Sequence, residues 1–177
     1  EALARLHEWG GRLGDALIAI GAVPARDIFK RLTEQMEQKL LDIFSWQSGR
    51  YGYYENQQPD KVGYPLGLNT YTLIVRGCRN HVPMEAIESY YRGRRDIQIR
   101  MQAQSRADID RFNLNPDELR IFNAHEQGMT LQQMESQLPV EDKEKLYRTI
   151  YLLHQVGVFQ FQATSPGELP PIERSKT

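Results

Sequence analysis

The strongest constraint on the fold is a helical pattern that begins at Pro24 and runs to Trp46. Apolar residues recur at three- and four-residue spacing in ARDIFKRLTEQMEQKLLDIFSW, and a proline in the first turn is already in the helical φ range. The predicted apolar face of this helix consists of Ile28, Leu32, Met36, Leu40, Ile43 and Phe44. The sequence therefore predicts one long amphipathic helix that ends at Gln47-Ser48-Gly49.

Shorter elements are predicted on both sides of this helix. Helical spacing punctuated by glycines predicts two short helices over 2–9 and 13–20. The alternating, tyrosine-rich RYGYYEN predicts a strand over 50–55 at a hairpin edge, followed by a loop in QQPDKVGYPLGL. Asn69 is predicted to cap a helix to His81, and Pro83 to open another that ends before Gly93. These elements form a first predicted unit, 1–94, which is a short helical bundle with a hairpin.

A second unit is predicted over 95–163. DIQIRMQAQ alternates apolar and polar residues, as in a half-buried strand, and VFQFQ predicts a closing strand. Between them, Asn-Pro-Asp-Glu at 115–118 and Thr130 with Gln133 are helix-start signals, and a third helix is predicted over 142–155. This order is winged-helix-like, so the predicted fold class is mainly α with minor β (α+β). The proline-rich tail, 164–177, is predicted to be disordered.

Composition limits the classes of function. The 177 residues include 40% hydrophobic residues and carry a net charge of −1, which predicts a globular chain without a general attraction to nucleic acid or membrane. No apolar run approaches the roughly 18 residues that span a bilayer, so no membrane insertion and a cytoplasmic location are expected. The chain begins with Glu1 inside a helical pattern, so we expect it to be a piece of a longer protein.

No motif for catalysis or metal binding is recognised. The single cysteine, Cys78, cannot form an internal disulfide, and a buried apolar role is favoured over a reactive thiol. The four histidines are scattered, which indicates no metal site. Because P-loop, nucleophile-elbow and kinase signatures are all missing from the sequence, a non-catalytic protein is expected.

The candidate working surface is a set of aromatic residues around the predicted hairpin. Tyrosine and tryptophan are enriched at interface centres because they bury a large area at a small cost in conformational entropy. The alternative, that these side chains pack against the long helix, stays open at this point. The predicted interaction residues are Trp46, Tyr51, Tyr53, Tyr54, Tyr64 and Leu66.

One family resemblance covers about residues 10–77. The blocks RLGDAL, QKLLDIFSW, SGRYGYYE and PLGL are similar, in order and spacing, to the C-terminal helical part of the PATAN family, as found beside kinase and response-regulator domains in myxobacteria-like signalling proteins. That resemblance implies a non-catalytic protein-interaction module in kinase, response-regulator or motility signalling. The N-terminal sheet portion of the family is not in this chain.

A second resemblance rests on RLGDALIAIGAV and the residues that follow it. It is similar to the motif of the N-terminal domain of type II secretion and pilus ATPases, which bind cyclic di-GMP. The resemblance implies Arg12, Gly14, Gly21 and Gln35 as ligand-binding residues. Asp27 and Arg31 depart from the motif, and the second copy that completes the family's site is missing from the chain. Glycine packing and a surface arginine are the alternative interpretation.

A third hypothesis concerns nucleic acid. Arg92, Arg94, Arg95 and Arg100 interleave with tyrosines near the predicted unit boundary, as in binders of single-stranded nucleic acid. Without a basic surplus, a solvated junction with paired charges is favoured. The expected function is therefore a protein-interaction module that binds another protein, another domain of the same chain or a second copy, with cyclic di-GMP binding and nucleic-acid binding as alternatives.

Overall fold

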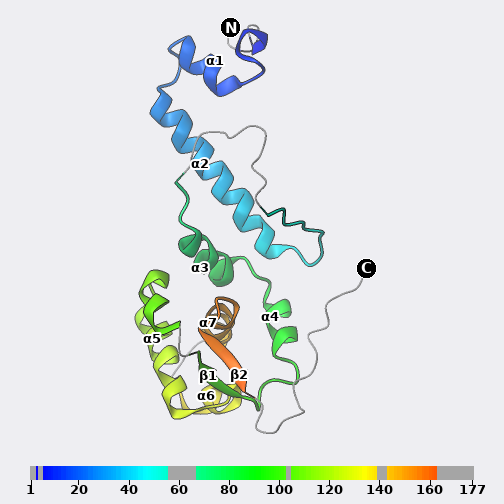
Figure 1. The fold of residues 1–177 in the computed structure, drawn as a ribbon, viewed down its shortest axis with the longest axis vertical. Coiled ribbons are helices and arrows are strands. Elements are labelled where there is room, and N and C mark those ends of the chain that lie inside the picture. Colours follow the sequence, from blue (N-terminus) through cyan, green and yellow to red (C-terminus); the bar gives the residue numbers. More distant parts are fainter. Residues whose placement is uncertain (1–2, 4–5, 56–66, 103–104, 139–142, 163–177) are drawn as a thin grey trace.

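The computed structural model describes residues 3, 6–55, 67–102, 105–138 and 143–162, and it is mainly helical with one small sheet (Figure 1). This confirms the predicted fold class. The elements of the first half are the 3-10 helix η1 (Leu6–Trp9), α1 (Leu13–Ala19), α2 (Ala25–Asp42), the 3-10 turn η2 (Ile43–Ser45), α3 (Thr70–Asn80) and α4 (Met84–Tyr91).

The second half has the element order that the sequence predicted, with two added 3-10 segments. Its elements are β1 (Gln98–Met101), η3 (Ser105–Phe112), α5 (Pro116–Asn123), η4 (Ala124–Gln127), α6 (Leu131–Gln137), α7 (Lys143–Gln155) and β2 (Phe159–Gln162). The two strands pair antiparallel, from Gln98 opposite Gln162 to Met101 opposite Phe159. Thr130 adds an isolated bridge to Gln98, on β1.

Three helices begin at the N-cap residues that the sequence predicted. The Asn69 side chain accepts a hydrogen bond from the backbone N–H of Thr72, at the start of α3. Asn115 and Glu118 form a complete capping box on α5, and Thr130 and Gln133 form one on α6. Each box satisfies backbone donors that the first helical turn leaves without an intrahelical partner.

α7 is the centre of the hydrophobic core. Its inward face, which includes the fully buried Leu146, Ile150 and Leu153, contacts α3, α4, α5 and β2. One continuous core therefore contains buried residues of α3 and α4 as well as residues of β1, α5, α6 and β2. The predicted unit boundary, between residues 94 and 95, lies between α4 and β1, which both contribute residues to this one core.

Two arginines connect the helices around this core. Arg79 on α3 donates to both carboxylate oxygens of Glu118, with Nε 2.6 Å from Oε1, and Glu118 is 3% exposed. Arg148 on α7 donates to the carbonyl oxygens of Val82 (2.7 Å) and Cys78 (3.3 Å), where α3 ends. Buried or half-buried polar groups of three helices are thus satisfied by side chains of their neighbours.

An aromatic cluster joins α4 to the end of α7. The Tyr90 hydroxyl lies 2.7 Å from Nδ1 of His154, and the Tyr90 ring packs edge-on to Tyr151. Burial, and next the charge of Arg94, lower the pKa of His154 below its usual value near 6.5. The folded chain therefore favours the neutral imidazole.

We expect the stability of the chain to fall as the pH is lowered through 6.5. A His154 pKa that is lower in the folded state means that the unfolded chain binds the proton more tightly. The contribution of His154 to stability is therefore complete above pH 6.5, and it is lost as the pH falls from 6.5 towards the folded-state pKa. Urea unfolding at pH 7.5 and 5.5 measures the loss. His154→Gln, which keeps a partner for the Tyr90 hydroxyl, should reduce the difference between the two pH values, and an unchanged difference would contradict the assignment.

The strand predicted over 50–55 is wrong: this segment is unpaired chain without strand structure, because no described segment lies beside it to complete a ladder. Within the helix predicted over 2–9, residues 6–9 form the 3-10 helix η1. The prediction for α2 did not specify what covers its apolar face: α2 contacts α1, η2 and α3, and Leu32, Met36 and Ile43 are 39–47% exposed.

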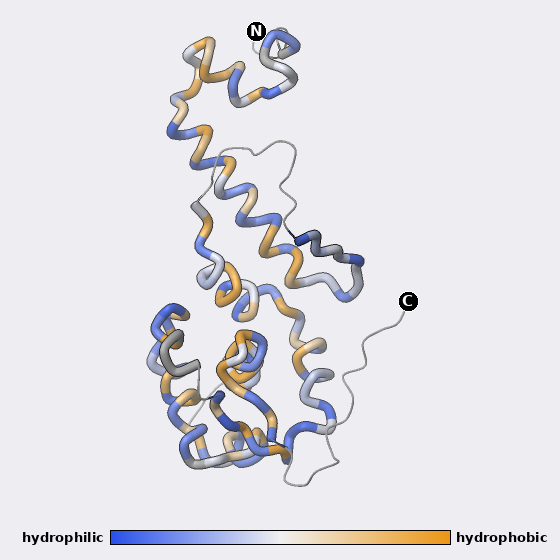
Figure 2. Tube along the Cα trace, in the orientation of Figure 1, coloured by the Kyte–Doolittle hydropathy of each residue, from blue (hydrophilic) through white to orange (hydrophobic). Residues whose placement is uncertain are grey.

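Figure 2 shows the hydrophobic residues, in orange, distributed along the length of α2. The α-helix itself ends at Asp42, and the rest of the predicted span continues as η2. Among the described residues, no helix combines the length and the apolar content that crossing a bilayer would require.

Candidate functional site

A groove between α1 and α2 contains most of the residues that the second resemblance singled out. Arg12, Gly14 and Gln35 line this cavity of about 760 Å³, together with apolar side chains such as Leu17 and Leu32. Gly21 is not among the lining residues. The structure therefore brings three of the four predicted ligand-binding residues to one place.

The α1–α2 groove has polar groups at its edge and apolar walls. Nε of Arg12 pairs with Oδ2 of Asp15 at 2.8 Å, and the Arg12 side chain is 72% exposed. A Cβ on Gly14 would lie 3.0 Å from Cγ2 of Ile28, so this glycine allows α1 to approach α2. Gly21 has φ +70° in the turn after α1, a conformation that glycine adopts without strain. Both glycines thus have structural roles, whether or not a ligand binds.

The predicted interaction residues that the structure describes are strongly exposed. Tyr51, Tyr53 and Tyr54 are 98%, 85% and 70% exposed, and Trp46 is 64% exposed. We refer to residues 50–54 as the tyrosine segment. Packing of these tyrosines against the long helix, the alternative interpretation from the sequence, is wrong for the described structure. Tyr64 and Leu66 lie outside the described residues.

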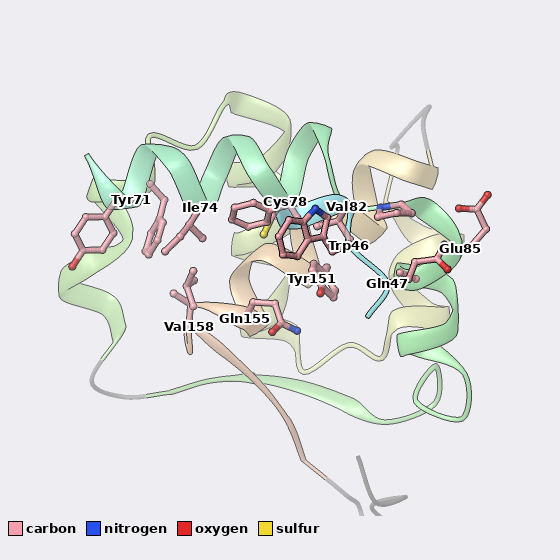
Figure 3. Close-up of a pocket in the computed structure, with 15 residues that line it drawn as sticks. Trp46, Gln47, Tyr71, Ile74, Cys78, Val82, Glu85, Tyr151, Gln155 and Val158 are labelled. Atoms are coloured by element: carbon pink, nitrogen blue, oxygen red, sulfur yellow. The ribbon is translucent and has the colours of Figure 1, made fainter. Parts of the chain in front are cut away.

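Trp46 also lines a second cavity, of about 850 Å³, which we call the aromatic groove (Figure 3). Side chains from η2, α3, α4, η3 and α7 contribute to its walls, and the labelled residues extend from Tyr71 on α3 at one end to Glu85 on α4 at the other. Its aromatic members are Phe44, Trp46, Tyr71, Phe112 and Tyr151; its other members are Gln47, Ile74, Cys78, Val82, Pro83, Glu85, Ala86, Gln155, Val156 and Val158.

The aromatic groove is apolar apart from a few groups. Glu85 is the one charged residue among those that line it, and Gln47 and Gln155 add amides. Cys78 is 2% exposed, and burial raises the pKa of its thiol to about 11 despite the nearby charge of Arg148. Such a thiol stays protonated near neutral pH, so the groove offers apolar contact rather than a nucleophile.

A close approach between α3 and η2 forms one wall of the groove. A Cβ built on Gly77 would lie 2.5 Å from three carbons of the Phe44 ring, so the ring lies directly on the glycine backbone. This contact explains why a glycine occurs in the middle of an 11-residue helix, where it lowers helix propensity.

We expect Gly77→Ala to lower the free energy of unfolding by about 1–2 kcal/mol, although alanine is the better helix former. The added methyl group must displace the Phe44 ring and so separates the end of α2 from α3. Chemical denaturation measures the loss. In a Phe44→Leu background the same substitution should cost less, and an equal cost would show that the clash is elsewhere.

Three of the four arginines considered for nucleic acid bind separate partners within the chain. Arg95 bonds Glu135, Arg94 bonds the carbonyl oxygen of Tyr90, and Arg100 bonds the Gln98 side chain. In a winged-helix DNA reader the last helix lies in the groove of the duplex. Here α7 is covered by α3, α4 and α5, so that face of the helix belongs to the core.

Sequence reasoning identified Trp46 but missed the rest of the aromatic groove. Tyr71, Phe112 and Tyr151 come from three segments far apart in the sequence, and each has the spacing of an ordinary core residue. The one available signal was Gly77 within a strongly predicted helix, which indicates a close neighbour.

Among the described residues, no group of three or more His, Cys, Asp or Glu side chains is placed to hold a metal ion.

Comparisons with protein-family models, with curated proteins and with solved structures find no match to this chain.

Proposed function

We propose that this chain is a non-catalytic protein-interaction module of a bacterial signalling protein, and that it binds its partner through the tyrosine segment and the aromatic groove. The observation that carries the proposal is the exposure of Tyr51, Tyr53 and Trp46, together with the open, aromatic-lined cavity to which Trp46 contributes. Aromatic side chains exposed to this extent are unfavourable in water and become favourable contacts when a partner covers them.

The setting in kinase, response-regulator or motility signalling comes from the sequence resemblance to PATAN domains. A regulatory role of this kind requires a surface whose contacts differ between signalling states, and no chemistry. A cytoplasmic location is part of the same proposal.

The test is site-specific photocrosslinking in the full-length protein in its own cells. A benzoylphenylalanine at Tyr53 should give one discrete protein adduct, whereas the same group at Lys39, an exposed position on α2, should give none. Tyr51→Ser with Tyr53→Ser should weaken binding of the identified partner about tenfold or more, as expected for aromatic residues at an interface centre. If probes at Tyr51, Tyr53 and Tyr54 give no adduct, the proposed function is wrong.

A second candidate function is supported by the α1–α2 groove. Arg12 and Gln35 line the same cavity, which is the arrangement that a cyclic di-GMP receptor of the resembled type needs. Asp15, paired with Arg12, would oppose a phosphate diester unless Arg12 changes its partner.

Isothermal titration with cyclic di-GMP tests this second candidate. Saturable micromolar binding that is lost in Arg12→Ala and kept in Arg26→Ala would support it. Arg26 is the matched control because it lies nearby, is 93% exposed and does not line the groove. No heat at high ligand concentration would leave an interaction module that acts without the nucleotide.

A further inference from the structure

We infer that the partner in the proposed interaction is a second copy of this chain, and that each copy inserts its tyrosine segment into the aromatic groove of the other. The inference rests on the proposed function, and it names the occupant of the groove. It connects two features that are otherwise unexplained: an open apolar cavity, and an adjacent segment with three exposed tyrosines.

The dimensions of the two features match. Tyr71 and Cys78 are seven residues apart on α3, so this wall alone is about 10 Å long, and the groove continues onto α4. The four residues 51–54 in extended form span about 13 Å. The cavity of about 850 Å³ is large enough for more than one aromatic side chain.

The charges also match. Glu85 is the charged residue of the groove and is exposed in the first turn of α4, with no ion pair to another described residue. Arg50 is exposed at the start of the tyrosine segment and likewise pairs with no described residue. A tyrosine segment that enters the groove of a second copy can place Arg50 beside the Glu85 carboxylate of that copy. This pairing sets the direction in which the segment lies in the groove.

The area that such an exchange buries is that of a specific interface. An aromatic side chain such as tyrosine buries about 150–250 Å², and Tyr51, Tyr53 and Tyr54 are each 70–98% exposed. Two such sets, together with the walls of two grooves, reach the range of about 1,200–2,000 Å² that is typical of specific interfaces. Because each copy carries one segment and one groove, a two-fold exchange uses both contacts and closes at the dimer.

The test is sedimentation equilibrium of the full chain from about 1 to 500 μM. The wild type should be a dimer at the upper concentrations. Two variants should be monomeric at the same concentrations while keeping the wild-type circular dichroism spectrum. The segment variant, Tyr51→Ser/Tyr53→Ser, lacks two tyrosines of the tyrosine segment. The groove variant, Ala86→Arg, blocks the groove at an exposed position and repels Arg50 of the second copy. Met36→Ser, on the exposed face of α2, is the matched control and should stay dimeric.

Mixing provides the decisive measurement. The segment variant still has an intact groove, and the groove variant still has an intact segment, so an equimolar mixture should form a heterodimer through one of the two contacts. Charge exchange is a second check: Arg50→Glu and Glu85→Arg should each weaken the dimer about 3–10-fold, and the double variant should recover most of that loss.

A wild type that is monomeric throughout overturns the inference, as does a mixture that shows no heterodimer. Loss of the dimer in Met36→Ser alone would assign dimerisation to the α2 face instead. If the chain is monomeric but Tyr53 crosslinks to another protein in cells, this inference fails and the proposed interaction function stands. If neither a dimer nor an adduct forms, both fail.

Discussion

Arg79→Ala is expected to lower the free energy of unfolding by about 3 kcal/mol at pH 7. The substitution leaves the Glu118 carboxylate 3% exposed without its cationic partner, and removal of one member of a buried ion pair typically costs about 3–5 kcal/mol. The backbone N–H of Asn115 still donates to Oε2 of Glu118 at 2.8 Å, so we expect a loss of unfolding free energy at the lower end of this range. Urea denaturation followed by circular dichroism measures it.

Arg76→Ala is the matched control for this substitution. Arg76 lies one turn earlier on α3 and pairs with Glu37 on α2, but the two side chains are 44% and 27% exposed. Exposed pairs contribute about 1 kcal/mol or less, so the control should lose far less stability. Similar losses in the two variants would contradict the importance given to burial of Glu118.

Ile150→Ala should cost about 3–4 kcal/mol, since it removes three carbons from a fully buried side chain at the centre of α7. Because α7 contacts α3, α4 and α5, we expect the whole described core to lose stability together. Tryptophan fluorescence in a Trp9→Phe background reports on Trp46, and circular dichroism reports on all helices. The two transitions should shift by the same amount.

Ile43→Ala is the control for Ile150→Ala, because the same atoms are removed from a side chain that is 47% exposed. It should cost under about 1 kcal/mol. If the Trp46 transition stays at its wild-type position when Ile150 is truncated, the chain unfolds in two steps and residues 1–94 form an independent unit.

Most helix boundaries were predictable from local chemistry. Asn69, Asn115 and Thr130 start helices by satisfying backbone donors that exist only at helix starts, so a short sequence pattern is enough to find them. The strands β1 and β2 were predictable for a similar reason, since each has apolar residues on the side that faces the core.

The predictions failed where the outcome depends on distant parts of the chain. The pattern of RYGYY is compatible with a strand, but a strand needs a neighbouring strand for its hydrogen bonds, and none lies beside this segment in the described structure. The apolar residues of α2 predicted a helix correctly, yet no periodicity can specify how many neighbours cover its face.

The same contrast between local pattern and distant packing explains why only part of the candidate sites was predictable. Arg12 and Gln35 were found because one local motif contains both. The aromatic groove is assembled by tertiary packing from η2, α3, α4, η3 and α7, and its residues have no common motif.

The 18 residues of α2 make it a rigid connection about 27 Å long between the two cavities. Ile28 and Leu32 at its beginning line the α1–α2 groove, and the chain continues from its end directly into Phe44 and Trp46 of the aromatic groove. A tilt of about 5° at the first groove displaces the far end of such a rod by about 2 Å. Helix α2 therefore joins the two cavities directly, so a displacement of its α1 end would move the backbone that carries Phe44 and Trp46, and with it one wall of the aromatic groove.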